Sequence, residues 1–271
     1  MASPILSSNR QFAPDAAIDA NASTISAADL GNLSTAPGAP SGTVADVFTY
    51  PGVILKTASL VVVAFLVAFP GYLYPNSLFA FGAMIGAAVI GLVLAFMRNT
   101  PPILAFLFAV LEGYALGAYS RIIELAYDVP GAALQALLAT AVTFAVVLAL
   151  YSSGKVRYTP KMQKFLLIGM VSYALFSLVN LLIMIFGGTE YGWGLRSDVT
   201  IMGIPLGILI GVFAVILACV SLIADFDFVE NAVKSRQPAK LEWKAAFGIT
   251  LTIVWLYLEF LRIIAILQGR D

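Results

Sequence analysis

Between residues 53 and 267 the chain contains seven long apolar stretches, which are separated by short polar segments. Each stretch has about the ~20 residues that an α-helix needs to cross a bilayer core. Proline, glycine and charged residues gather between them, as in "MRNTPP" and "YSSGKVRYTPK", which is typical of loops. The pattern predicts an all-α membrane protein, a seven-transmembrane-helix bundle with spans at residues 53–72, 78–97, 103–123, 132–151, 165–186, 203–224 and 245–267.

Residues 1–49 have a different character, because small and polar residues dominate and large apolar side chains are almost absent. Such a segment buries too little apolar surface to fold alone. It also lacks the basic start and apolar core of a secretory signal. We therefore expect two parts: a disordered cytoplasmic N-terminal arm at 1–49 and a seven-helix transmembrane domain at 50–271.

Composition agrees with a membrane protein and narrows its chemistry. Hydrophobic residues make up 61% of the chain and charged residues 11%, against roughly 45–50% and about 25% in soluble domains. The formal net charge is zero, so no basic field attracts nucleic acid. The chain has no histidine and one cysteine, Cys219, which excludes the usual zinc, haem and iron–sulfur ligands and any Ser/His/Asp triad. We expect no cofactor and no enzymatic activity.

Basic residues are distributed unevenly over the connections between spans. The first, third and fifth connections contain only Arg121 and Arg196, whereas the even-numbered connections contain Arg98, Lys155, Arg157, Lys161, Lys164, Lys234, Arg236, Lys240 and Lys244. By the positive-inside rule the even-numbered connections face the cytoplasm. The N-terminal arm is then inside and the C-terminus outside.

Three carboxylates follow the sixth span in "LIADFDFVE", residues 222–230. At about 100° per residue, Asp225 shares a helix face with Ser221 and Gly211, and Asp227 lies roughly 200° round from it. Glycines at 203, 207 and 211 form the small-xxx-small pattern that lets membrane helices approach closely. Asp225 is thus expected to point into the bundle, and Asp227 and Glu230 toward water and lipid head groups.

Two further carboxylates lie inside predicted spans. Glu112 is near the middle of the third span and Glu259 is in the outer half of the seventh. Because a charge at the bilayer centre costs ~2.5–3.5 kcal/mol on insertion scales, such residues normally face a cavity, pair with a cation or stay protonated. Arg262, three residues after Glu259, offers a local ion pair. On the seventh span Gly248, Thr252 and Glu259 share one face, which we call the polar stripe.

Three segments resemble a known family: "LEGYALGAYSRI" (111–122), "LIADFDFVENAV" (222–233) and "EWKAAFGITLTIVWLYLEFLRII" (242–264). They are similar to the Bax inhibitor family of transmembrane Bax-inhibitor-motif proteins, particularly its actinobacterial branch, over roughly residues 56–270. The resemblance implies a seven-helix bundle with a central last helix, in the bacterial plasma (inner) membrane. It also implies a pH-sensitive leak of cations, chiefly calcium, while other bacterial members associate with a membrane protease.

The family links proton and calcium sensing to a pair of aspartates, one on the sixth helix and one on the seventh. Asp225 matches the first by its place in "LIADFDFVE". The second falls on Thr252, which cannot ionise, so the resemblance gives this chain one carboxylate of the pair. Asp227 is an alternative for the missing second carboxylate, but its position on a different face of the helix disfavours this role. Arg98 is an alternative partner, which would hold Asp225 in an ion pair.

Two functional hypotheses follow. In the first, the protein is a calcium- or proton-sensitive cation leak channel, with Asp225 as the candidate calcium ligand at a cytoplasmic gate. Thr252 would supply a neutral oxygen, and Glu112 and Glu259 would line or stabilise a polar path. In the alternative, the protein is a non-conducting regulator that binds a membrane protein partner such as a protease. The N-terminal arm and the glycine-lined helix faces, such as that of glycines 203, 207 and 211, would then be its docking surfaces.

Overall fold

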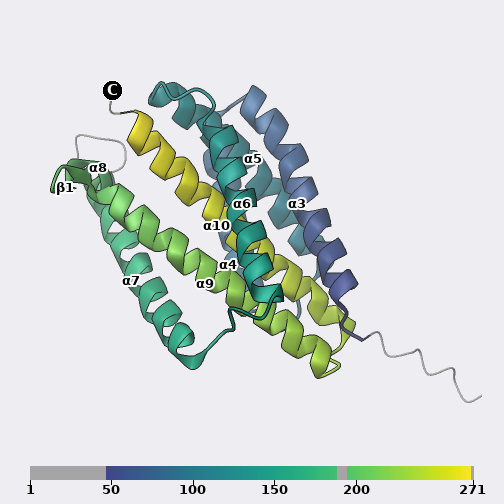
Figure 1. Ribbon diagram of the computed structural model, residues 1–271. Helices are drawn as coiled ribbons and strands as arrows, with labels where there is room; N and C mark the ends of the chain where they lie inside the picture. Colours follow the sequence, from purple (N-terminus) through teal and green to yellow (C-terminus); the bar gives the residue numbers. More distant parts are fainter. Residues whose placement is uncertain (1–46, 188–193, 270–271) are drawn as a thin grey trace, which may run out of the picture. The chain divides into compact units, whose positions relative to one another are not determined.

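The computed structural model describes residues 47–187 and 194–269. Within these residues seven helices are long and apolar enough to cross a membrane, which confirms the predicted fold class (Figure 1). They are α3 (Tyr50–Leu73), α4 (Ser77–Phe96), α5 (Pro102–Ala126), α6 (Ala132–Ser152), α7 (Pro160–Ile185), α9 (Leu206–Lys234) and α10 (Glu242–Gln268). Residues 1–46 of the N-terminal arm lie outside the described part, so the disorder predicted for them stays a prediction.

Short polar signals determine where several helices begin. The Thr49 hydroxyl accepts a hydrogen bond from the Gly52 N–H at 3.1 Å, and the Asn76 side chain accepts one from the Phe79 N–H at 3.1 Å. These are N-cap contacts, which satisfy backbone donors that the helix itself leaves unpaired. Helices α3, α5 and α7 also have proline in their first turn, where a missing N–H does no harm.

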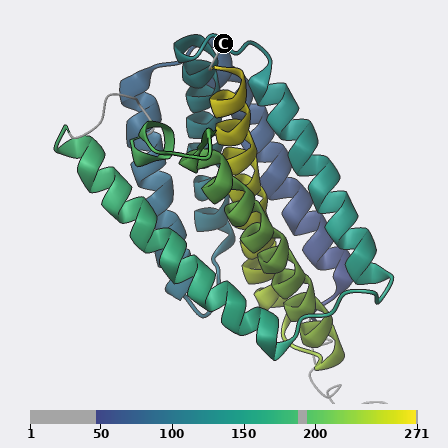
Figure 2. The same cartoon turned by 60° about the vertical axis from the view of Figure 1, so that its left-hand side comes forward.

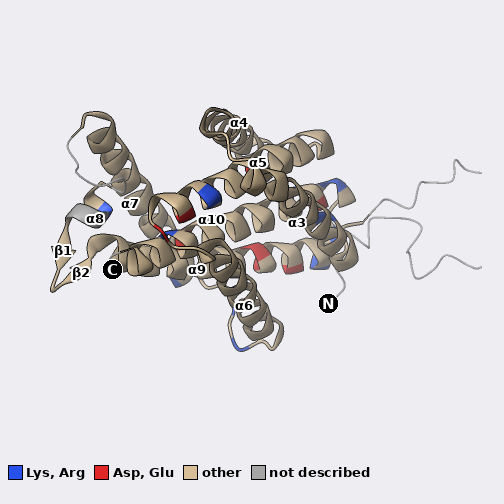
Figure 3. Ribbon diagram, turned by 90° about the horizontal axis from the view of Figure 1, so that it is seen from above, with Lys and Arg blue, Asp and Glu red and all other residues tan. Residues whose placement is uncertain are grey.

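Helix α10 lies at the centre and contacts α3, α5, α6 and α9 (Figure 3). It can do so because apolar and small side chains surround it on most faces, a distribution typical of a helix buried on all sides. Ala246 packs with Leu60 of α3 and with Ala105 and Ala109 of α5, and Leu261 packs with Ala136 of α6. Groups on α10 are therefore placed against nearly every other helix.

Glycines of α5 bring α3 and α5 into direct backbone contact. A methyl group at Gly113 would collide with the backbone of Ala64, and one at Gly117 with the carbonyl of Ala68. Membrane helices associate through such close packing because lipid tails are as apolar as the side chains themselves. This pair forms one rigid side of the bundle around α10.

On the opposite side, α7 crosses α9 at an angle (Figure 1 and Figure 2). The short helix α8 (Leu195–Asp198) and the antiparallel strands β1 (Thr200–Ile201) and β2 (Ile204–Pro205) connect α7 to α9, and α8 contacts both α7 and α9. Met202 and Gly203 both have positive φ, 53° and 82°, as a tight two-residue hairpin turn requires. Gly203 therefore belongs to the hairpin. Of the three glycines at 203, 207 and 211, only Gly207 and Gly211 pack against α10, at Ile266 and Ile263 respectively.

The sixth span is longer than its apolar stretch indicates. It was expected at residues 203–224, but α9 begins at Leu206 and continues to Lys234, a length of ~43 Å at 1.5 Å per residue. The helix can continue through these charged residues because they pair within it: the Lys234 ammonium donates to Glu230, one turn earlier, at 2.5 Å. All three carboxylates of the 222–230 segment thus lie on a continuous helix.

The last residues of the predicted arm belong to the folded part. The Phe48 N–H donates to the Gln237 carbonyl at 2.8 Å, and the Phe48 ring, 1% exposed, meets Phe228 edge-on with ring centroids 6.4 Å apart. Val47 pairs with Pro238 in an isolated β-bridge. The start of α3 is therefore attached to the turn between α9 and α10.

The α3–α5 contact predicts a position-specific effect of a single methyl group. Gly117→Ala should lower the free energy of unfolding in detergent by about 1–3 kcal/mol, because the added methyl forces two backbones apart. Gly82→Ala on α4 is the matched control, since nothing lies within 4 Å of its added methyl. Equal stability of both variants in thermal unfolding would contradict this packing.

Candidate functional site

The acidic segment of α9 distributes its three carboxylates over different surroundings. Asp225 faces α10, where the Thr252 hydroxyl donates a hydrogen bond to its Oδ2 at 2.8 Å. The side chain is half-buried. Ser221, one turn earlier on α9, places its hydroxyl 3.4 Å from that of Thr252. The structure thus brings Asp225 and Thr252 together, with Ser221 beside them.

Gly248 permits this close approach. A methyl group at that position would lie 3.2 Å from Oδ1 of Asp225. The Thr252 hydroxyl also lies 3.1 Å from the Gly248 carbonyl, its own helix's oxygen one turn back. Carboxylate, hydroxyl and carbonyl oxygens therefore converge between α9 and α10, and such hard oxygen atoms are the ligands that calcium prefers.

Asp225, Thr252, Ser221 and the Gly248 carbonyl form what we call the oxygen cluster. None of the ion pairs found in the described part of the chain includes Asp225. Among the same residues no three His, Cys, Asp or Glu side chains gather closely enough to hold a metal ion. A cation here would meet one carboxylate and several neutral oxygens, an arrangement suited to weak, reversible binding rather than to a tightly held metal.

The ion pair considered between Arg98 and Asp225 is not present in the structure. Arg98 is exposed after the end of α4, which packs against α5, whereas Asp225 lies between α9 and α10. The end of α4 is held in another way, because the Lys244 ammonium donates to the Met97 carbonyl at 2.8 Å. Arg98 is therefore not paired with Asp225 in this conformation.

Asp227 and Glu230 have partners other than Thr252, and Glu230 contacts the end of α6 and the loop after it rather than open solvent. Asn231 donates to Asp227 at 2.9 Å. Glu230 accepts from Arg157 and Lys234, each at 2.5 Å, and from the Tyr151 hydroxyl at 2.6 Å. These groups connect the end of α9 to the loop after α6.

That loop covers the acidic end of α9 through an aromatic side chain. Tyr158 packs against the apolar cluster that includes Phe226. Burial raises the pKa of the Tyr158 hydroxyl, and the charges of Asp227 and Asp225 raise it further. The hydroxyl therefore remains protonated and able to donate at neutral pH.

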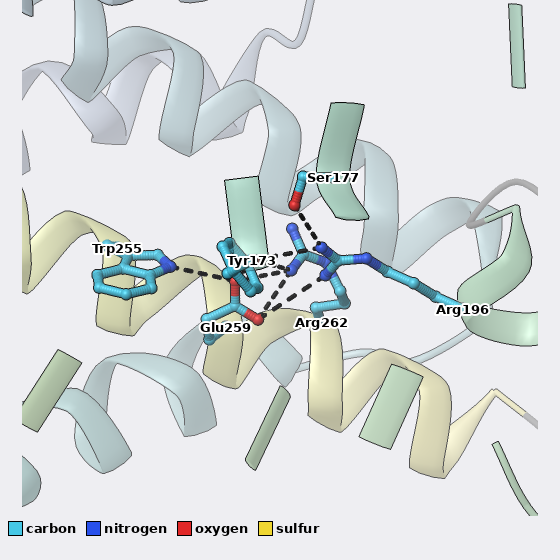
Figure 4. A network of polar contacts seen from close by, with 6 residues as sticks. All are labelled: Tyr173, Ser177, Arg196, Trp255, Glu259 and Arg262. Carbon is cyan, nitrogen blue, oxygen red and sulfur yellow. Dashed lines mark hydrogen bonds and ion pairs between the residues drawn. The ribbon is translucent and has the colours of Figure 1, made fainter. Parts of the chain in front are cut away.

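A second polar cluster surrounds Glu259, toward the opposite end of the bundle (Figure 4). Its side chain is 1% exposed, and Arg262 Nη1 donates to both carboxylate oxygens at 2.8 Å. Tyr173 of α7 and the Trp255 indole also donate to it. Arg196 of α8 adds a guanidinium nitrogen 4.0 Å from Glu259 Oε2. Glu259 is thus a paired, buried charge, which the Arg262 spacing indicated in part.

Glu112 does not lie on the side of α10 where Asp225 and Glu259 lie. It follows Phe108 and Ala109 by one turn on α5, and those residues pack against Phe247 and Ala246 of α10. Ala246 is about 200° round α10 from Gly248 at 100° per residue. These neighbours favour separate surroundings for Glu112 and Glu259, and a polar path lined by both stays a prediction.

Several polar groups that the structure places in contacts were not among the predicted site residues. Glu242 accepts from Lys56 at 2.5 Å and from the Thr49 N–H at 2.8 Å, which secures the junction before α3. Glu124 accepts from Tyr72 at 2.5 Å and from the Ala133 N–H at 2.9 Å. Apart from the Glu124–Ala133 contact, these pairs join residues far apart in sequence, so the sequence contains no local signal for them.

Comparison with known protein families shows which family the chain belongs to. The family model described as Bax inhibitor 1 like matches residues 3–269. The chain belongs to this family. No curated protein matches it in a search of such sequences. The Bax inhibitor 1 like match confirms the resemblance seen in the three segments, and the actinobacterial branch stays a prediction.

The buried pairing of Glu259 predicts a large effect on stability. Glu259→Gln should lower the free energy of unfolding by about 3–5 kcal/mol, because it leaves buried guanidinium groups without their carboxylate. Glu230→Gln is the control: two of its partners, Arg157 and Lys234, are 50% and 67% exposed, and solvent screens such pairs. Thermal unfolding in detergent measures both, and an equally large loss in Glu230→Gln would contradict the assignment.

Proposed function

We propose that this Bax inhibitor 1 like protein is a cation leak channel of the bacterial plasma membrane, with a calcium- and proton-sensitive gate at Asp225. The observation that favours this function is a half-buried carboxylate surrounded by neutral oxygens between two transmembrane helices. A carboxylate kept only for stability would normally have a cationic partner or full solvent exposure. We propose no enzymatic activity and no resident cofactor.

The positive-inside rule supports an orientation with Asp225 near the cytoplasmic side and the C-terminus outside. Asp225 would then bind a cation entering from the cytoplasmic mouth, while Thr252 and Ser221 supply oxygens that replace part of its hydration shell. A proton binding to Asp225 removes the charge that attracts the cation. Both ions would therefore act on the same two oxygen atoms.

Apolar packing above Asp225 supports a closed state in this conformation. Leu222 and Ala218 of α9 pack with Leu256 of α10, and all three are fully buried. Leu256 lies between Thr252 and Glu259, which are ~10 Å apart along the axis of α10. Hydrophobic constrictions of this kind block ions by excluding water. Conduction would require α9 and α10 to move apart here.

Asp225 can be tested in liposomes loaded with a calcium-sensitive dye between pH 6 and pH 8. We expect the wild-type flux to vary with pH, and we expect Asp225→Asn to lower it several-fold and remove that variation. Asp227→Asn is the matched control on the same turn, because Asp227 contacts Asn231 and not Thr252. If Asp225→Asn and the wild type gave the same flux at each pH, Asp225 would not be the gate.

Removal of the N-terminal arm separates the channel from the non-conducting regulator. A variant lacking residues 2–46 retains Phe48 and Thr49, whose contacts hold the start of α3. We expect its flux in liposomes to equal that of the full chain. A wild-type protein without flux at any pH, together with loss of a cellular phenotype on removal of the arm, would favour the regulator that binds a membrane protein partner.

A further inference from the structure

The connection between α7 and α9 inserts a cationic side chain into the bundle. Arg196 is the second residue of α8, and it is only 4% exposed. Asn180 of α7 fixes the start of α8 by accepting a hydrogen bond from the Leu195 N–H at 2.8 Å. On the other side, a methyl group at Gly207 of α9 would lie 2.7 Å from the Arg196 carbonyl oxygen. The segment is thus wedged between α7 and α9.

The Arg196 guanidinium contacts both α7 and α10 (Figure 4). Its Nη2 donates to the Ser177 hydroxyl at 3.0 Å and to the Tyr173 hydroxyl at 3.3 Å. The group also lies over the rings of Tyr173 and Phe176, 5.3 and 5.4 Å from their centroids. Its Nη1 lies 4.0 Å from Glu259 Oε2. Arg196 therefore covers the Glu259 end of the polar stripe.

Stabilisation of Glu259 is not a sufficient reason for this arrangement. Arg262 already donates to both oxygens of Glu259 at 2.8 Å. Arg196 is the more distant cation, and its buried Nη1 has no hydrogen-bond acceptor. A buried donor without an acceptor destabilises the folded state. The burial of the Arg196 guanidinium is better explained by an effect on ions that approach the polar stripe from the Glu259 end.

We infer that Arg196 closes the Glu259 end of the polar stripe to cations and determines the charge of the ions that can enter there. This inference rests on the proposed conduction along the stripe. Gly248, Thr252 and Glu259 lie on one face of α10, so a cation leaving the Asp225 cluster along that face would meet the Arg196 guanidinium. A fixed like charge in a site of low dielectric constant repels it.

Substitution of Arg196 tests the inference by flux. Arg196→Gln removes the charge and retains a donor for Ser177, and we expect it to raise calcium flux about tenfold, the lower end of the range for charges lining a cleft. Arg196→Lys retains the charge and should stay near the wild type. Arg121→Gln is the matched control, because Arg121 is half-exposed, pairs with Glu124 and lies outside the stripe.

Chemical labelling gives a readout that does not depend on conduction. In a Cys219→Ala background, Ala214→Cys places a thiol at a fully buried position of α9, one turn from Gly211 and hence near Glu259. A small, positively charged, membrane-impermeant thiol reagent is added on both sides of the membrane. We expect labelling to be about tenfold faster with Arg196→Gln than with Arg196 or Arg196→Lys.

The two readouts distinguish the possible failures. Faster labelling without flux in any variant would support closure by Arg196 and contradict the channel. Flux in the wild type, with neither flux nor labelling changed by Arg196→Gln, would overturn the inference and leave the channel intact. Equal increases in Arg196→Gln and Arg196→Lys would show that packing rather than charge closes this end, which also contradicts the inference. Thermal unfolding of each variant in detergent shows whether it is folded.

Discussion

The close contact between α9 and α10 is the constraint on which the other features of this molecule depend. Within a bilayer, packing rather than water exclusion holds helices together, so small residues must lie where two backbones approach. Gly207 and Gly211 supply that contact at one end, where Ile266 and Ile263 of α10 fill the space. Gly248 supplies it at the other end, beside Asp225. The glycines thus determine which polar groups of the two helices can meet.

This contact explains why the polar groups form two separate clusters. Asp225 and Thr252 meet near one end, and Glu259 is surrounded by cations and hydroxyls toward the other. Between them Leu256 packs with Ala218, and this apolar contact separates the two levels. Each cluster is therefore free to have its own chemistry: neutral oxygens around a carboxylate at one level, and guanidinium groups around a carboxylate at the other.

Much of this arrangement could be predicted from helical periodicity. The number of spans and the different directions of Asp225 and Asp227 follow from properties local to one helix. The extension of α9 to Lys234 did not, because a hydrophobicity pattern ends at the first charges although the helix continues through them. The side of α10 that Glu112 occupies and the insertion of Arg196 depend on how distant segments pack, which one sequence does not contain.

The hydroxyl at Thr252 has a physical consequence for a site with a single carboxylate. A second aspartate at that position would place two like charges in contact, and one of them would have to bind a proton. The hydroxyl instead donates to Asp225 and stabilises its charged form without adding charge. The proton sensing that we propose for this site would then involve one group rather than a coupled pair. Any steeper response to pH must come from the helices that the site joins, because a single carboxylate titrates over a broad range.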